Sequence, residues 1–128
     1  MKYMLMMNCP RDGYEQYMKW PKALLAANGA FMQEFARKLS ASGELVAAEG
    51  LTAPTQATRV YLGKNGKPVT DGVFPETKEY LAGWWIVDVD GPERAHELAA
   101  EAAHAPGQGD GPLVIEVRRV MQGHEDLG

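Results

Sequence analysis

The chain has 128 residues, of which 45% are hydrophobic, and its 13 basic and 17 acidic residues give a net charge of −4. These values fit one globular domain and argue against disorder, a basic nucleic-acid arm or a disulfide-stapled mini-protein. The one cysteine, Cys9, has no partner for an internal disulfide, and no apolar run approaches the roughly 20 residues of a membrane span. We therefore expect a single cytoplasmic domain over residues 1–128, without a membrane segment or direct nucleic-acid binding.

The first half of the chain predicts a strand, a long helix and a second strand. An apolar run over residues 2–8 ends before Pro10, which cannot donate to a sheet ladder. Residues 10–21 contain turn formers and predict a loop, with a helical turn at 15–20. Apolar side chains then recur at helical spacing over residues 22–41, and 44–50 predicts the second strand.

The second half predicts a hairpin, a long strand, a helix and a last strand. The predicted strands span residues 57–62, 68–70, 80–89 and 113–121. Asn65-Gly66 is a strong hairpin signal between the first two of them. Asp90 is expected to cap a helix whose first turn contains Pro92. The glycine-rich segment 105–112 predicts a mobile loop.

This element order predicts an α+β chain with a ferredoxin-like βαββαβ fold and an extra short hairpin strand. The strands at 2–8 and 80–89 are almost continuously apolar, which is typical of strands buried on both faces. Two helices can cover only one face of such a sheet. We expect the same sheet of a second chain to cover the other face, giving a homodimer, because large exposed apolar patches are rare.

Few residues indicate a reaction. Cys9 ends an apolar strand and has no histidine near it in sequence, so a buried, inert thiol is expected. His96 and Glu97 begin like a zinc-helix motif, but Ala100 stands where the second histidine belongs. The pair Asp88 and Asp90 allows acid–base chemistry, or a helix cap beside a salt-bridged strand end. No metal ligand cluster or cofactor motif is found, and neither a metal nor a cofactor is expected.

The segment from Thr70 to Tyr80 combines turn formers, an aromatic side chain and several charges. Asp71-Gly72 suits a turn, and the charges that follow fit a solvated connection. The same segment also lies near the start of a predicted strand, where a cleft at the sheet end would put it in contact with a ligand.

This segment resembles the signature of the YCII-related proteins, in the branch named after an Asp-Gly-Pro-Phe motif. The matching stretches are Asp71–Phe74 with Glu76–Trp84, Met1–Leu5, Ser42–Val46 with Glu49–Leu51, and Ile115–Arg118. The resemblance covers nearly the whole chain. Val73 stands where the motif has proline, so a strict turn requirement does not carry over.

The resemblance implies a ferredoxin-like dimeric α/β barrel of unsettled function. Some members are proposed to be enzymes through a His–Asp pair near the first strand and helix, but this chain has no histidine before His96. The branch is often associated with extracytoplasmic-function sigma factors, which implies a regulatory role. Similar dimeric barrels include small isomerases and monooxygenases that enclose aromatic or lactone substrates.

Two hypotheses follow, and neither decides whether the protein is an enzyme. In the first, a dimer encloses a small-molecule pocket between sheet and helices. The expected walls are Trp84, Trp85, Phe31 and Met6, and the expected polar contacts are Asp71, Lys78 and Arg118. In the second, the dimer is a non-catalytic partner of a sigma factor. A closed apolar pocket favours the first hypothesis, and a solid core with a large exposed patch favours the second.

Overall fold

The computed structural model describes residues 1–11, 13–71, 78–107 and 113–127. Over these ranges the elements are β1 (Lys2–Pro10), α1 (Gly13–Met18), α2 (Lys22–Ala41), β2 (Leu45–Gly50), the 3₁₀ turn η1 (Pro54–Gln56), β3 (Arg59–Leu62), β4 (Pro68–Asp71), β5 (Glu79–Asp88), α3 (Pro92–Ala102), β6 (Ile115–Arg119) and the 3₁₀ turn η2 (His124–Leu127). None of the described helices combines the length and the apolarity that crossing a bilayer requires.

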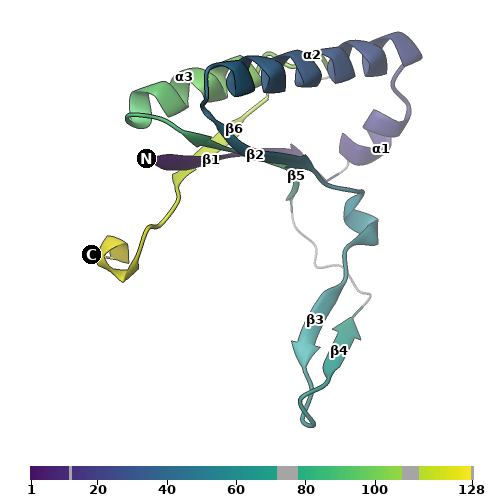
Figure 1. The fold of residues 1–128 in the computed structure, drawn as a ribbon. Coiled ribbons are helices and arrows are strands. Elements are labelled where there is room, and N and C mark those ends of the chain that lie inside the picture. Colours follow the sequence, from purple (N-terminus) through teal and green to yellow (C-terminus); the bar gives the residue numbers. More distant parts are fainter. Residues whose placement is uncertain (12, 72–77, 108–112, 128) are drawn as a thin grey trace.

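The sheet has four strands in the order β2-β5-β1-β6, and every neighbouring pair is antiparallel. The two long apolar strands β1 and β5 therefore lie in the centre, and the shorter strands form the edges. Helices α2 and α3 both lie over one face of this sheet (Figure 1). The predicted α+β, ferredoxin-like fold is confirmed.

The core lies between the helices and the sheet face that they cover. Alternate residues of the central strands point into it, because side chains of a strand alternate between faces. Leu5 and Val87 are completely buried, and Trp85 keeps 7% of its surface exposed. The ring of Phe35 from α2 meets Trp85 edge-on, with centroids 5.5 Å apart. This side of the sheet is therefore packed as the helical periodicity predicts.

Strands β3 and β4 form a separate two-stranded hairpin. It projects from the sheet on the side opposite the helices (Figure 1). The predicted Asn-Gly turn is confirmed, since Gly66 has a φ of 78° and Asn65 accepts a hydrogen bond from the Lys67 backbone at 3.0 Å. The sequence predicted one extra strand, whereas both strands of the hairpin stay outside the four-stranded sheet.

Element ends differ from the sequence predictions at several places, among them β1, which includes Pro10 rather than ending before it. Asp90 is not the cap of α3: the cap is Gly91, without a side-chain bond, because Pro92 occupies the first helical turn. Strand β6 is shorter than the predicted 113–121, since its ladder with β1 ends at Arg119. Helix α1 begins at Gly13, before the predicted turn. Segment 108–112 and residues 72–77 of the motif segment lie outside the described residues.

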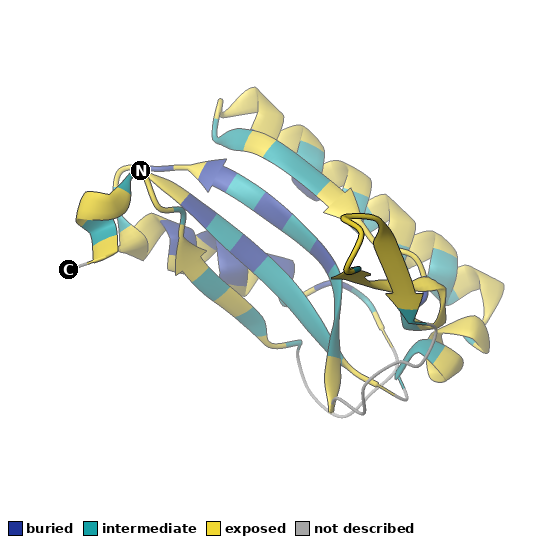
Figure 2. Cartoon of the chain, turned by 90° about the horizontal axis from the view of Figure 1, so that it is seen from below, coloured by how far each residue is buried: buried dark blue, intermediate teal, exposed yellow. Residues whose placement is uncertain are grey.

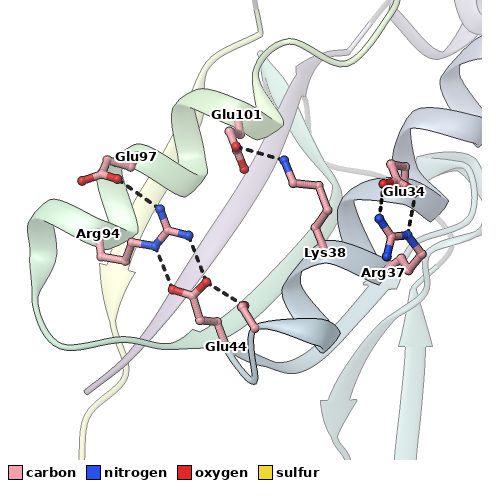
Figure 3. A network of polar contacts seen from close by, with 8 residues as sticks. Glu34, Arg37, Lys38, Glu44, Arg94, Glu97 and Glu101 are labelled. Carbon is pink, nitrogen blue, oxygen red and sulfur yellow. Dashed lines mark hydrogen bonds and ion pairs between the residues drawn. The ribbon is translucent and has the colours of Figure 1, made fainter.

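Ion pairs join the helix layer to the sheet (Figure 3). The guanidinium of Arg94 on α3 donates through Nε and Nη2 to both oxygens of Glu44, at 2.8 and 3.0 Å. Glu44 directly precedes β2, and its pKa is lowered mainly by these hydrogen bonds from Arg94. Lys38 on α2 contacts Glu101 on α3 at 3.3 Å. These contacts fix the two helices and the start of β2 relative to each other.

Candidate functional site

A cavity of about 910 Å³ lies at the end of the sheet where β1 finishes and β5 begins. Helices α1 and α2 and the segment that follows α3 supply its other walls. Its volume falls within the roughly 300–1,000 Å³ of small-molecule sites. A cavity of this size is large enough to hold a small molecule.

The backbone of the sheet makes room for the cavity. Gly83 of β5 pairs with Met7 on one side and with Gly50 on the other. A Cβ atom on Gly83 would lie 3.1 Å from the carbonyl oxygen of Glu49, a tight approach that a side chain could make only if the neighbouring strand shifted by a few tenths of an ångström. A Cβ on Gly50 would meet no atom within 4 Å, so this position faces open space. The two glycines leave the floor of the cavity without side chains.

Aromatic rings form one wall. The rings of Tyr14 and Tyr17 on α1 have centroids 6.2 Å apart, and Tyr17 lies 5.0 Å from Trp20. Trp20 packs closely on Gly107, where an added Cβ would lie 3.0 Å from the ring atom Cη2. The buried Nε1 of Trp20 has no hydrogen-bond partner among the described residues. The wall therefore joins the chain before α2 to the chain after α3.

The ionisable groups next to these rings are shifted toward their neutral forms. Burial, and then the neighbouring Cys9, Tyr14 and Tyr17, raise the pKa of Tyr80 to about 12. Burial, and then the charge of Glu79, raise the pKa of the Cys9 thiol. Because a thiolate is the nucleophilic form of cysteine, Cys9 is not activated for nucleophilic attack. Cys9 and Tyr80 instead act as neutral wall groups at pH 7.

Polar groups complete the lining without forming a metal centre. Asn28 of α2 donates to the Pro106 carbonyl oxygen at 2.9 Å and so holds the segment after α3 against the cavity. Within the described ranges, no group of three or more His, Cys, Asp or Glu side chains could hold a metal ion. The three histidines, His96, His104 and His124, are exposed and do not line the cavity. The arrangement can enclose and orient an apolar molecule.

The structure brings together two of the seven site residues that the sequence predicted. Trp84 and Trp85 both line the cavity. Phe31 lies on α2 and packs against the core and Phe35, with ring centroids 6.1 Å apart. Met6 lies beside Trp84 on the sheet face that the helices leave uncovered.

The three predicted polar contacts lie apart from one another. Asp71 ends β4, Lys78 is exposed directly before β5, and Arg118 of β6 lies beside Met4 on the uncovered face. None of the three is a lining residue. Asp88, which the sequence offered either for acid–base chemistry or as a salt-bridged strand end, accepts a hydrogen bond from the N-terminal ammonium group at 3.1 Å. The structure therefore places it in a salt bridge at the end of β5.

Sequence reasoning missed the aromatic wall. Tyr14, Tyr17 and Trp20 recur at intervals of three, a spacing that places side chains on one face of a helix. That signal was available, but the surrounding Pro and Gly residues favoured a loop. Tyr80 and Gly107 carry no local signal, because only tertiary contacts bring them to the same cavity.

A comparison with models of known protein families shows which family this chain belongs to. The model of the YCII-related domain matches residues 1–122. The chain belongs to the YCII-related family. The match therefore spans every strand of the ferredoxin-like sheet in this YCII-related protein, and the cavity lies entirely within it. No curated protein matched the sequence.

Proposed function

We propose that this YCII-related protein is a homodimer that binds a small aromatic or lactone-like molecule in the cavity. The cavity of about 910 Å³, with its wall of aromatic rings, is the observation that carries the proposal. Large rings provide apolar contact area with little loss of side-chain entropy, and a few polar groups among them orient the ligand. The neutral Cys9 and Tyr80 favour binding over covalent catalysis.

The uncovered face of the sheet supports the homodimer. Met4, Met6, Trp84 and Ile86 lie side by side on this face, as the strand register shows. Each is only half-buried in the single chain, and no described helix covers them (Figure 2). Packing this face on its copy about a two-fold axis would bury on the order of 2,000 Å² in total. Arg118, on the same face, would then lie within the interface.

A cavity-filling variant tests the ligand proposal. Gly50→Leu places a side chain in the open space of the cavity, whereas Gly29→Leu adds the same atoms at an exposed position on α2. The wild-type protein and Gly29→Leu should release a co-purified small molecule on denaturation, detected by mass spectrometry, and should gain thermal stability from it. Gly50→Leu should release less than a tenth as much. Equal amounts from all three proteins would exclude the cavity as the site.

We also propose, as the second candidate, a regulatory contact with an extracytoplasmic-function sigma factor. The hairpin β3–β4 favours it, since Val60, Leu62 and Val69 are 62%, 85% and 52% exposed. Scattered exposed apolar residues are ordinary, but these three, together with the 44% exposed Tyr61, lie on one projecting hairpin and suit a protein contact. Co-expression with the sigma factor encoded nearest the gene, followed by size-exclusion chromatography, tests this. A complex lost in Leu62→Asp and kept in Gly50→Leu supports the regulatory role, and the absence of any complex excludes it.

A further inference from the structure

We propose that Trp20 selects the ligand of the cavity, because its Nε1–H donates a hydrogen bond to a carbonyl oxygen of the bound molecule. The inference rests on the proposed function, since it names the ligand class of the same cavity: a neutral aromatic molecule that carries a carbonyl group. Three observations support it: an unpaired donor, the position of the ring that bears it, and the neutral groups around that ring.

The indole N–H of Trp20 is a buried donor without an acceptor. Its Nε1 is covered by the protein, and in the described part of the chain it is the one buried side-chain nitrogen or oxygen that lacks a hydrogen-bond partner. An indole nitrogen can only donate, and a buried tryptophan normally meets an acceptor. Because an unpaired buried donor is unfavourable, a molecule that brings an acceptor to Nε1 removes this cost as it binds.

The position of Trp20 puts this donor at the cavity. Trp20 belongs to the lining, and its ring lies 5.0 Å from that of Tyr17, with the two planes at 59°. Its backbone N–H donates to the Tyr17 carbonyl oxygen at 3.1 Å, and Pro21 follows directly before α2. These contacts hold the Trp20 backbone between α1 and α2, and the freedom that remains is that of the side chain.

The edge of the ring next to Nε1 packs on Gly107. A Cβ added to Gly107 would lie 3.0 Å from Cη2 and 3.3 Å from Cζ2 of Trp20, and Cζ2 is bonded to the carbon that carries Nε1. In this position the ring closes the wall, and its own donor is covered. The second side-chain torsion of tryptophan has broad minima, so the indole can turn from Gly107 toward the cavity. An acceptor on the ligand stabilises the turned position, in which Nε1 reaches the bound molecule.

The groups around Trp20 favour a neutral acceptor over an anionic one. Burial, more than the nearby ionisable groups, raises the pKa of Tyr80 to about 12, and those groups include Tyr14 and Tyr17 of the aromatic wall. Burial is also the first cause of the raised pKa of the Cys9 thiol. Because burial here opposes the negative charge of a phenolate or a thiolate, it opposes a ligand carboxylate for the same reason. A neutral carbonyl oxygen accepts the hydrogen bond without bringing a charge into the site.

Two probes that differ at one position test the hydrogen bond. 1-Indanone and indane have the same fused rings, and the carbonyl group of the first is a methylene group in the second. We would titrate both by calorimetry at pH 7 into the full-length wild-type protein and into Trp20→Phe, which keeps an aromatic ring and loses the N–H. The affinity of 1-indanone relative to indane should fall about fivefold or more in Trp20→Phe. The ratio cancels the ring surface that both probes lose.

Tyr61→Phe is the control variant. It also removes one donor from an aromatic ring, but Tyr61 lies on β3 and is not a lining residue. Its ratio of the two affinities should equal that of the wild type.

A measurement on the wild-type protein makes the test independent of whether Trp20→Phe folds. The chain has three tryptophans, whose indole N–H groups give separate signals in a proton–nitrogen correlation spectrum. The Trp20 signal is assigned through its nuclear Overhauser contacts with Tyr17. It should move downfield on addition of 1-indanone, because the N–H gains an acceptor, and should move much less with indane, which has the same aromatic ring.

The outcomes separate this inference from the proposed function. 1-Indanone binding that is lost in Gly50→Leu but keeps the wild-type ratio to indane in Trp20→Phe would overturn the role of Trp20 and leave the cavity as the ligand site. An unmoved Trp20 signal in the presence of saturating 1-indanone would do the same. Binding of neither probe to the wild type would overturn both proposals.

Discussion

The two faces of the central sheet carry similar side chains in different surroundings. On the helix-covered face, Leu5 and Val87 are completely buried. On the other face, Met6 and Ile86 of the same two strands are only half-buried (Figure 2). Alternation along the strands makes both faces apolar, but the chain has helices for one of them. The difference teaches that an apolar strand pattern predicts burial on both faces of the sheet, whereas the described helices of this chain cover one of them, which is why we propose a second chain over the other.

The largest expected loss of stability comes from a substitution on the helix-covered face of the sheet. Trp85→Ala removes a ring that is 7% exposed and packed edge-on against Phe35. The free energy of unfolding should fall by about 3–5 kcal/mol, because a large cavity remains in the core. Urea denaturation measures this. A loss below about 1 kcal/mol would mean that the two faces do not differ in packing.

The next largest effect is expected on dimer association, from a substitution on the uncovered face of the sheet. Ile86→Lys puts a charge in the middle of the proposed dimer interface and should weaken association by at least about 2 kcal/mol, roughly thirtyfold. Gln33→Lys, at an exposed position on α2, is the control and should associate like the wild type. Analytical ultracentrifugation over a dilution series measures both. A wild-type monomer at micromolar concentration, with a melting temperature independent of dilution, would contradict the dimer.

A smaller loss of stability is expected when the ion pair that connects the helix layer to the sheet is removed. The hydrogen bonds from Arg94 lower the folded-state pKa of Glu44 below its usual 4.5. Their stabilisation is therefore fully present above about pH 4.5 and is lost as the pH falls through the lower folded-state value. The Arg94 side chain is 43% exposed, so the contribution is screened to about 0.5–1 kcal/mol.

Denaturation of Arg94→Gln between pH 3 and pH 7 measures this contribution. The variant should be less stable than the wild type at pH 7 and should approach it in acid. Arg37→Gln is the control, because the Arg37–Glu34 pair lies within α2 and does not connect the helices to the sheet. A deficit of Arg94→Gln that stays constant with pH would show that packing, and not the ion pair, is responsible.

The smallest effect is expected on the hairpin, which belongs to neither face of the sheet. Leu62 is 85% exposed, so Leu62→Ser should change the free energy of unfolding by less than about 0.5 kcal/mol. Thermal denaturation at two protein concentrations provides the measurement. A clear loss that grows on dilution would place the hairpin in the dimer contact.

Local sequence signals predicted the elements where they are strong and periodic. Helix α2 has the predicted bounds, and the Asn65-Gly66 turn lies where its dipeptide indicates. Signals failed where two rules competed. Pro92 moved the cap of α3 from Asp90 to Gly91, because proline fixes the first helical turn.

The sequence by itself determined the family, the order of elements and the apolar character of both sheet faces. Only the tertiary structure decided where the cavity lies. Gly83 and Gly50 have to pair across two strands to open its floor, and Trp20 has to reach Gly107, far along the chain, to close its wall. Local periodicity contains no information about such contacts, because it reflects only the repeat of each element. The cavity arises from how those elements pack together.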